Sequence, residues 1–515
     1  MDDILTDEID SLYESLSVAE SDSTDSGASA GQQQESCVAK TDTIPIMNYD
    51  VLHQVLRTLD RRSLLRTLRT CRGFYSLGLR VLLESPIFLD HRNFKGFCRF
   101  ILADRENRGA LVRDLTLLDC SRALQIKECV IDFLRVLQHV TALRKLCVAQ
   151  SDRVGLNIPL VLYKIITLPG VHDLELLGVG RLTQTLLDEV TIQAETLALR
   201  YTFTLRLEDA LIALKQLSRH ESRLRALEVY SLRFDDRELR PFTHLQELCI
   251  STIPHEELSA DRLIYLFPNL STLVIMDSHS NSDFVGHEEI RNASKGTTQQ
   301  EKRWSGLTRL MGPAYVLHAL GLTCTVRCLK LILSHTPAFF EHTVKDIIQD
   351  AITDCHPTAL EVSVGSLSKL QLLSKMQKHT PYLTHLSLEY SFSYFNQNAW
   401  DEELDLVGFV NDLFKILSPL SLEYLEIHFE DSSRDFMLSD IKKYLPQDYL
   451  GIGTPTDFMA RLMDTVPTLN TAYIVIPGCK PAFFRVSDNG SGRRIALPIK
   501  DMSQRYTEFA RRNAS

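Results

Sequence analysis

The stretch Val112-Arg113-Asp114-Leu115-Thr116-Leu117 has the pattern apolar-x-x-Leu-x-apolar, and this pattern returns along most of the chain. Such an alternation of apolar and polar positions predicts a short strand with one buried face. Clear copies occupy residues 143–148, 171–176, 224–229, 245–250, 270–275, 326–331, 383–388 and 422–427, and weaker copies occupy residues 194–199, 357–362 and 469–474. Self-similarity of this kind indicates a repeat protein.

The fourth residue of each copy, which we call its anchor, sets the spacing of the repeat. The anchors are Leu115, Leu146, Leu174, Leu197, Leu227, Leu248, Leu273, Leu329, Leu360, Leu386, Leu425 and Ala472, and most steps are 21 to 31 residues. The longer steps, from 273 to 329, from 386 to 425 and from 425 to 472, predict insertions or an unrecognised repeat. Four copies carry a proline two residues before their first apolar position, where it ends the preceding helix. The predicted unit is therefore a helix, a proline and a short strand.

This unit resembles that of irregular leucine-rich-repeat-like proteins. The resemblance implies an α/β solenoid (horseshoe) over residues 84–482, with a parallel sheet and helices on its convex side. Residues 277–306 are polar and lack periodicity, so we expect a long loop or disordered insertion there. Residues 483–497 have two apolar runs around Asp488-Asn489-Gly490, which predicts a hairpin that caps the last strand, within a cap and tail over 483–515.

Residues 44–83 differ from the repeats and predict three short helices. Asn48 is a plausible N-cap for the first helix, and Ser63 for the second. Apolar residues then recur at helical spacing, at Val51, Leu52, Val55, Leu56 and Leu59, at Leu64, Leu65 and Leu68, and again from Phe74 onward. A module of about 40 residues has a very small core, so we expect a partner or a neighbouring domain to cover its apolar faces.

The same segment resembles the F-box. That motif begins with Leu-Pro, continues with an amphipathic helix ending in Leu-Asp and an acidic residue before two leucines, and ends with a Cys followed by Trp or Phe. The corresponding residues of this chain are Ile44-Pro45, Leu59-Asp60, Ser63-Leu64-Leu65 and Cys71-x-x-Phe74. Ser63 replaces the usual acid, and Arg61-Arg62 makes the turn basic. The resemblance implies docking of a small Skp-family adaptor through Ile44, Pro45, Val51, Leu52, Val55, Leu56, Leu64, Leu65 and Phe74. The alternative is a plain helical hairpin that caps the repeats.

The net charge of −10 is concentrated in residues 1–43, which hold eleven acidic residues and one base. The remaining 472 residues hold 55 acidic and 55 basic residues, so a nucleic-acid-binding surface is not expected. The segment is rich in Ser, Asp, Gln and Glu, which predicts disorder. Ile4, Leu5, Ile9, Leu12 and Leu16 have helical spacing, so a solvated tail and a partner-binding amphipathic helix both stay open.

No motif for catalysis, a cofactor or a metal stands out. The chain has no phosphate loop, no dinucleotide-binding glycine pattern and no H-E-x-x-H, and its eleven cysteines include no C-x-x-C pair. No stretch approaches the roughly 20 apolar residues that span a bilayer. Residues 1–20 do not have the pattern of a signal or transit peptide. We therefore expect a non-enzymatic protein of the cytoplasm or nucleus, without metal or cofactor, and with no membrane partner.

The exposed positions at the middle of the predicted strands form a candidate binding row on the concave face. The charged members of this row are Glu175, Glu228, Lys330, Glu361 and Glu426. A mildly acidic row predicts a basic segment on a bound protein. The alternative is that these are ordinary solvated strand positions.

An F-box followed by such repeats resembles fungal F-box proteins. The resemblance implies a substrate receptor of an SCF-type cullin–RING E3 ubiquitin ligase, within the ubiquitin-like conjugation pathway. Its F-box would bind the adaptor and, through it, a cullin, while the repeats hold a target protein; we expect one copy in the hetero-complex. The rival hypotheses are a non-ligase interaction scaffold and an enzyme, and an enzyme would require a convergent polar pocket.

Overall fold

The chain folds as two compact units, Met1–Tyr230 and Ser231–Ser515. The computed structural model describes residues 48–189, 194–201, 211–213, 217, 221–233, 239–252, 259–276, 287–297, 304–333, 344–364, 380–392, 406–431, 455–475, 482–488 and 494–498. The predicted tail, residues 1–43, lies outside these ranges. Across the described part, three N-terminal helices precede parallel strands that alternate with helices, so the predicted α/β fold class is confirmed.

The three predicted helices of the first unit are present, as α2 (Tyr49–Thr58), α3 (Arg61–Leu68) and α4 (Arg72–Glu84). Asn48 is the N-cap of α2, as predicted, and its side chain accepts a hydrogen bond from the backbone N–H of Asp50. The N-cap of α3 is Asp60, whose carboxylate accepts from the backbone N–H of Ser63. The prediction of Ser63 as that cap was wrong, because the cap and the start of the helix lie three residues earlier.

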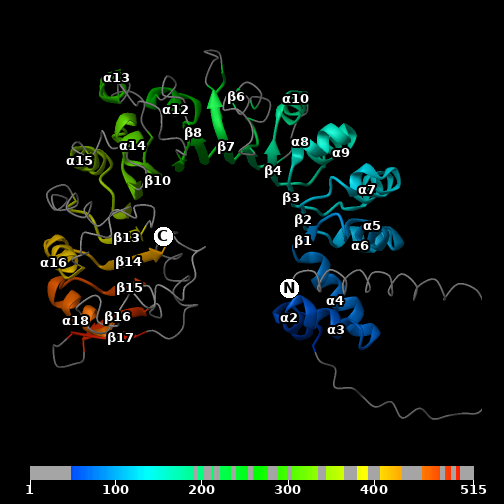
Figure 1. Ribbon diagram of the computed structural model, residues 1–515, viewed down its shortest axis with the longest axis horizontal. Helices are drawn as coiled ribbons and strands as arrows, with labels where there is room; N and C mark the ends of the chain where they lie inside the picture. The colour runs from blue at the N-terminus through cyan, green and yellow to red at the C-terminus, as the bar shows by residue number, and fades with distance from the viewer. Residues whose placement is uncertain are drawn as a thin grey trace, which may run out of the picture. The chain divides into compact units, whose positions relative to one another are not determined.

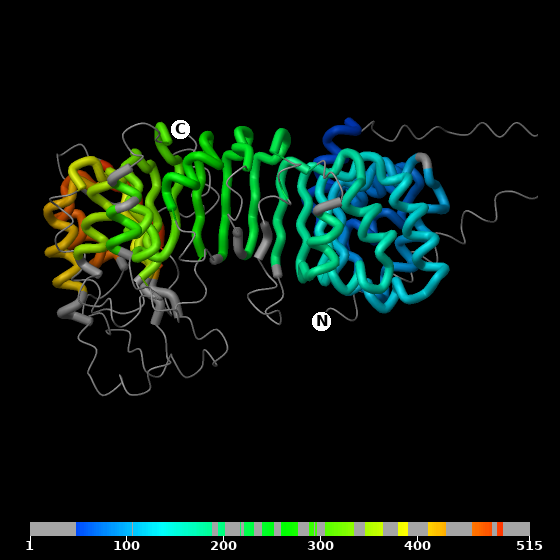
Figure 2. Tube along the Cα trace, turned by 90° about the horizontal axis from the view of Figure 1, so that it is seen from above, coloured from blue at the N-terminus to red at the C-terminus, as the bar shows by residue number. Residues whose placement is uncertain are grey.

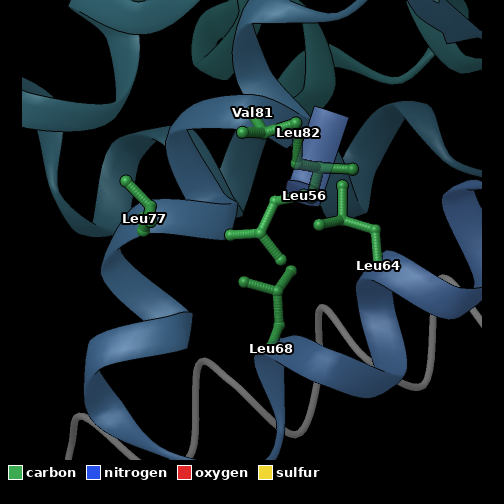
Figure 3. Packing of buried hydrophobic residues seen from close by; sticks show 6 residues of the cluster. All are labelled: Leu56, Leu64, Leu68, Leu77, Val81 and Leu82. Carbon is green, nitrogen blue, oxygen red and sulfur yellow. The ribbon is translucent and has the colours of Figure 1, made fainter. Parts of the chain in front are cut away.

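Six buried side chains from these helices make one small core. They point toward one another in Figure 3 and are Leu56, Leu64, Leu68, Leu77, Val81 and Leu82. Gly78 allows α3 to pack closely on α4, since a Cβ at that position would lie 2.5 Å from a methyl carbon of Leu68. Apolar burial of this size stabilises the module only modestly.

The rest of the first unit alternates strands and helices. Its helices are α5 (Phe94–Ala103), α6 (Arg105–Arg108), α7 (Lys127–His139), α8 (Ser151–Asn157), α9 (Pro159–Ile166) and α10 (Arg181–Glu189). Its strands are β1 (Ile87–Leu89), β2 (Asp114–Leu117), β3 (Lys145–Val148), β4 (Asp173–Val179), β5 (Thr196–Tyr201), β6 (Leu211–Ala213) and β7 (Ala226–Arg233). Helices α5, α7, α9 and α10 lie on one side of the strands in Figure 1.

The predicted anchors of this unit stack directly beside one another. Leu115 pairs with Leu146, Leu146 with Leu174, Leu174 with Leu197, and Leu197 with Leu227, all in parallel strands. All five side chains are buried. The repeat therefore predicted the parallel strands, and the structure shows that their anchors are paired in register. The structure adds β1 at the start, where Ile87 pairs with Leu115.

The second unit continues with the same kind of repeat. Its strands are β8 (Glu247–Thr252), β9 (Thr272–Ile275), β10 (Leu307–Pro313), β11 (Val326–Ile332), β12 (Ala359–Val364), β13 (His385–Phe392), β14 (Tyr424–Asp431), β15 (Thr471–Val475), β16 (Ala482–Asp488) and β17 (Arg494–Pro498). Its helices are α12 (Ala260–Leu266), α13 (His287–Thr297), α14 (Ala314–Leu320), α15 (Val344–Cys355), α16 (Leu406–Leu417) and α18 (Pro455–Thr465). Strands β8, β9 and β10 run side by side in the green segment of Figure 2.

The long step between anchors 273 and 329 contains an unrecognised repeat. Leu310 of β10 pairs with Leu273 of β9 on one side and with Leu329 of β11 on the other. From there, the anchors Leu329, Leu360, Leu386, Leu425 and Ala472 are again paired in order. Of the two explanations for this gap, the additional repeat is confirmed.

The expectation of a structureless segment at residues 277–306 was wrong, because α13 lies within it. The buried face of α13 includes Arg291 and Ser294, which are polar and left no apolar periodicity to recognise. Arg291 donates to the carbonyl oxygen of His318 at 2.8 Å and to the carboxylate of Asp354 at 2.7 Å. Its guanidinium also lies 3.0 Å from the carboxylate of Asp350. Ion pairs thus join α13 to α15, and a hydrogen bond joins it to α14.

The burial of His318 on α14, beside this ionic contact, predicts that the second unit is sensitive to acid. Burial and the nearby Arg291 guanidinium lower the pKa of His318, against the opposing effect of Asp350 and Glu288. The folded chain therefore holds fewer protons at this site than the unfolded chain. We expect the free energy of unfolding to fall as pH drops from 7.5 through the ordinary imidazole pKa of about 6.5.

A urea titration followed by tryptophan fluorescence tests this, since Trp304 is buried in the second unit. The urea midpoint of the unaltered chain should fall between pH 7.5 and pH 5.5, and the fall should be smaller in His318→Gln. An equal fall in both chains would assign the acid sensitivity to other groups.

Both strands of the predicted hairpin at residues 483–497 are present. Strand β16 pairs antiparallel with β15 and with β17, so the last parallel strand is paired along both edges. The predicted turn, residues 488–490, lies largely outside the described residues.

Candidate functional site

The first candidate surface is the apolar face of α2. Val51 and Val55 lie one helical turn apart and are 51% and 49% exposed. Leu52 and Leu59 beside them are only partly buried against the module core. Branched aliphatic side chains that stay half in water on a small module mark a surface that a partner can cover.

The structure divides the predicted adaptor-binding residues into three groups. Val51 and Val55 are exposed, whereas Leu52, Leu65 and Phe74 are partly buried and pack on the core. Leu56 and Leu64 are buried within the core, where they hold the helices together and present no surface. Ile44 and Pro45 lie outside the described residues. Tyr49, which the sequence reasoning did not select, is 60% exposed at the start of α2.

Charged side chains connect α2 to α4 beside this face. The Glu84 carboxylate accepts from Arg57 at 3.3 Å and from Arg80 at 2.9 Å. Burial acts to raise the pKa of Glu84, but the hydrogen bonds and charges of Arg80 and Arg57 outweigh it and lower that pKa. Arg57 and Arg80 are largely exposed, so each pair contributes little stability; the Arg57 pair joins α2 to α4, whereas the Arg80 pair lies within α4.

The second candidate surface is the row of charged residues on the strands. In the first unit, Arg200 lies between Glu175 and Glu228, at 3.2 Å and 2.6 Å from their carboxylates. Arg200 is two residues from the row position Ala198 on β5, so it projects on the same face of the strand. The sequence reasoning missed it because it considered one position in each strand. The two predicted acids are thus already paired with a base.

The same pairing occurs in the second unit. The Lys330 ammonium lies 3.6 Å from the carboxylate of Glu361 and 3.5 Å from that of Glu389. Arg309 lies 3.8 Å from Glu361. Neither Arg309 nor Glu389 was among the predicted residues. These contacts leave the row less acidic than its sequence indicates.

Glu426 differs from the other members of the row because it is buried. The Tyr424 hydroxyl donates to its carboxylate at 2.9 Å, and the ring nitrogen Nε2 of His428 is hydrogen-bonded to it as well. Tyr424, Tyr473 and Phe483 form a buried aromatic cluster at this end of the sheet. The expectation of an exposed carboxylate at position 426 was wrong, since aromatic side chains on β14 to β16 cover this face.

Comparison with known families identifies one domain. Residues 44–83 match the family model of the F-box domain. They include the described helices α2, α3 and nearly all of α4, so the F-box resemblance is confirmed for this segment. A search of curated proteins finds no match to the chain. The F-box is followed by a long α/β region of mainly parallel strands.

The described residues contain no group of three or more His, Cys, Asp or Glu side chains that could hold a metal ion. The nine cysteines among them are free thiols, and burial raises the pKa of most of these, to about 11 for Cys147 and Cys324. No helix in the described ranges has the length and apolar character needed to cross a bilayer.

Proposed function

We propose that this chain is the substrate-recognition subunit of an SCF-type cullin–RING E3 ubiquitin ligase. The F-box domain at residues 44–83, with Val51 and Val55 exposed on α2, is the observation that supports it. In this proposal the F-box binds a Skp-family adaptor and, through it, a cullin. The repeats of residues 84–482 hold a target protein.

The proposed mechanism is proximity. Binding a target to the same assembly as a ubiquitin-charged enzyme raises the effective concentration of one near the other, up to about millimolar for a short flexible connection. That mechanism requires no catalytic residue in this chain. It requires two separate binding surfaces, one for the adaptor and one for the target.

For the adaptor we assign direct contact to Val51, Leu52, Val55, Leu65 and Phe74, and we retain Ile44 and Pro45 as flanking contacts. Leu56 and Leu64 act indirectly, by holding α2 on α3 and α4. For the target we retain the charged row on the strands, through Glu175, Glu228, Lys330 and Glu361. Charged groups of a bound protein would replace the present partners of these residues. Such an exchange favours selectivity over affinity.

The adaptor surface can be tested with charges at exposed positions. We expect Val51→Asp/Val55→Asp to weaken binding of a Skp-family adaptor at least tenfold in a titration of the purified full chain, since each carboxylate would be desolvated without a partner. Both valines are about half exposed, so amide hydrogen exchange across residues 49–84 should stay as in the unaltered chain.

The matched control is Met276→Asp/Tyr382→Asp, which places the same charges at two exposed apolar positions in the second unit. It should leave adaptor binding unchanged. Adaptor binding by the unaltered chain together with recovery of a cullin supports the ligase proposal. Binding of the adaptor without a cullin would favour a non-ligase scaffold, and a folded chain that does not bind the adaptor would disprove the proposal.

A further inference from the structure

The first unit has an apolar surface that the proposed function does not use. Five of the thirteen exposed large apolar side chains among the described residues belong to one stretch, residues 126–163. They are Ile126, Ile131, Leu156, Leu160 and Tyr163. Single exposed apolar residues need no explanation, but a group on adjacent helices indicates an interaction site.

Two of these side chains, Ile131 and Leu160, line a groove of about 530 Å³ between α7 and the helices α8 and α9. Along α7 its wall is formed by Lys127, Val130, Ile131 and Leu134, which are spaced as one stripe on a helix. The opposite wall includes Ile158 and Leu160. A groove lined mainly by apolar side chains, with one wall along a helix, fits an amphipathic helix that lies beside that wall.

The helices around the groove carry net positive charge. Helices α7, α8 and α9, which line it, hold four bases (Lys127, Arg135, Arg153 and Lys164) and three acids (Glu128, Asp132 and Asp152). Asp132 and Arg135 lie 3.6 Å apart and offset each other, and Asp152 accepts from the backbone N–H of Thr183 at 3.0 Å. Lys127 lines the groove itself. An acidic ligand is therefore the complementary one.

A segment of this chain has the matching chemistry. Leu5, Ile9, Leu12 and Leu16 are spaced by four, three and four residues, which places them on one face of a helix. Residues 1–20 contain seven acids and no base. The segment lies outside the described residues, so the inference rests on its sequence and on the described groove.

We propose that residues 4–16 bind as an acidic amphipathic helix in the groove between α7 and α9. Their apolar stripe would cover Ile131 and Leu160, and their carboxylates would approach Lys127 and Lys164. The 31 residues that connect this segment to Asn48 can extend about 100 Å, at 3.3 Å per residue. A compact unit of this size has a radius of gyration of only about 16 Å, so the connection does not restrict binding. The groove is then a site that the chain's own acidic segment occupies reversibly.

A fluorescent peptide of residues 1–20 provides the test. It should bind the full chain carrying Leu5→Ser/Ile9→Ser/Leu12→Ser/Leu16→Ser about tenfold more tightly than the unaltered chain. The unaltered chain's own segment competes at an effective concentration of about 1 mM, against an assumed peptide Kd of about 0.1 mM. Adding Leu160→Asp to the serine variant should abolish binding, because it charges one wall of the groove. Leu160 is 53% exposed, so this substitution should not unfold α9.

Three controls make the test specific. Adding Met276→Asp to the serine variant, at an exposed position in the second unit, should leave peptide binding unchanged. A peptide with the same composition but a scrambled apolar stripe should bind at least tenfold more weakly. Carbodiimide treatment of the unaltered chain should link the amine of Lys127 or Lys164 to carboxylates of residues 1–20. Equal peptide affinity for the two chains, binding that survives Leu160→Asp, or equal binding of the scrambled peptide would each overturn the proposal.

Discussion

Leu56→Ala is expected to destabilise the F-box domain by about 2–5 kcal/mol, the range for truncation of a buried leucine. Leu56 is 2% exposed and lies among five other buried side chains from α3 and α4. A module of three short helices has few other contacts to compensate for the cavity. Because the adaptor would bind only the folded module, we expect adaptor binding to weaken in parallel.

Amide hydrogen exchange of residues 49–84 is the measurement, since it reports on this module separately from the repeats. A loss of 2–5 kcal/mol corresponds to exchange that is about 30-fold to several-thousandfold faster, at 1.36 kcal/mol per tenfold. Val55→Ala is the matched control, because it truncates the neighbouring half-exposed residue and should change stability by no more than about 0.5 kcal/mol. Unchanged exchange in Leu56→Ala would show that Leu56 contributes little to the module core.

This contrast between neighbours shows what a sequence can predict for the F-box. Helical spacing placed Val51, Leu52, Val55 and Leu56 on one broad apolar face, and the structure confirms the helix. It did not separate buried Leu56 from exposed Val55, because that depends on where α3 and α4 pack. Periodicity identifies an apolar face, whereas tertiary packing decides which part of the face is left for a partner.

The same limit explains the missed repeat. Residues 307–312 read Leu-Thr-Arg-Leu-Met-Gly, which fits the repeat pattern except that Gly312 occupies the last apolar position. A Cβ at position 312 would lie 3.0 Å from the backbone oxygen of Ile275 on the adjacent strand, a tight approach that favours glycine there. The exception is therefore a consequence of packing between β9 and β10, which the sequence of one strand does not reveal.

For the charged row, the sequence correctly placed the residues on strands of the sheet but did not reveal their partners. Arg200, Arg309 and Glu389 pair with row members from other positions on the strands. Such pairs depend on register and on side-chain length. A prediction of charge from one position per strand therefore overstated the acidity of this face.

The second large effect is expected from Arg291→Met, which should destabilise α13 by about 3 kcal/mol, near the lower end of the range for breaking a buried ion pair. The Arg291 side chain is 5% exposed and contacts Asp350, Asp354 and the carbonyl oxygen of His318. The lower end applies because each remaining carboxylate keeps either a basic partner or contact with water. Asp354 keeps the Lys295 ammonium at 3.1 Å, and Asp350 is 44% exposed to water.

Amide exchange in α13 should accordingly become about 100-fold faster in Arg291→Met, while exchange in the F-box domain stays unchanged. Lys295→Met removes a base that is 35% exposed and contacts the same Asp354, so its effect should stay below about 1 kcal/mol. Arg291→Lys keeps the charge but replaces the planar guanidinium with a single ammonium group. Its loss of stability should therefore lie between those of Arg291→Met and Lys295→Met. If Arg291→Met and Lys295→Met had equally small effects, the ion pairs of Arg291 would not be what holds α13 in place. Apolar contacts would then account for the stability of this helix.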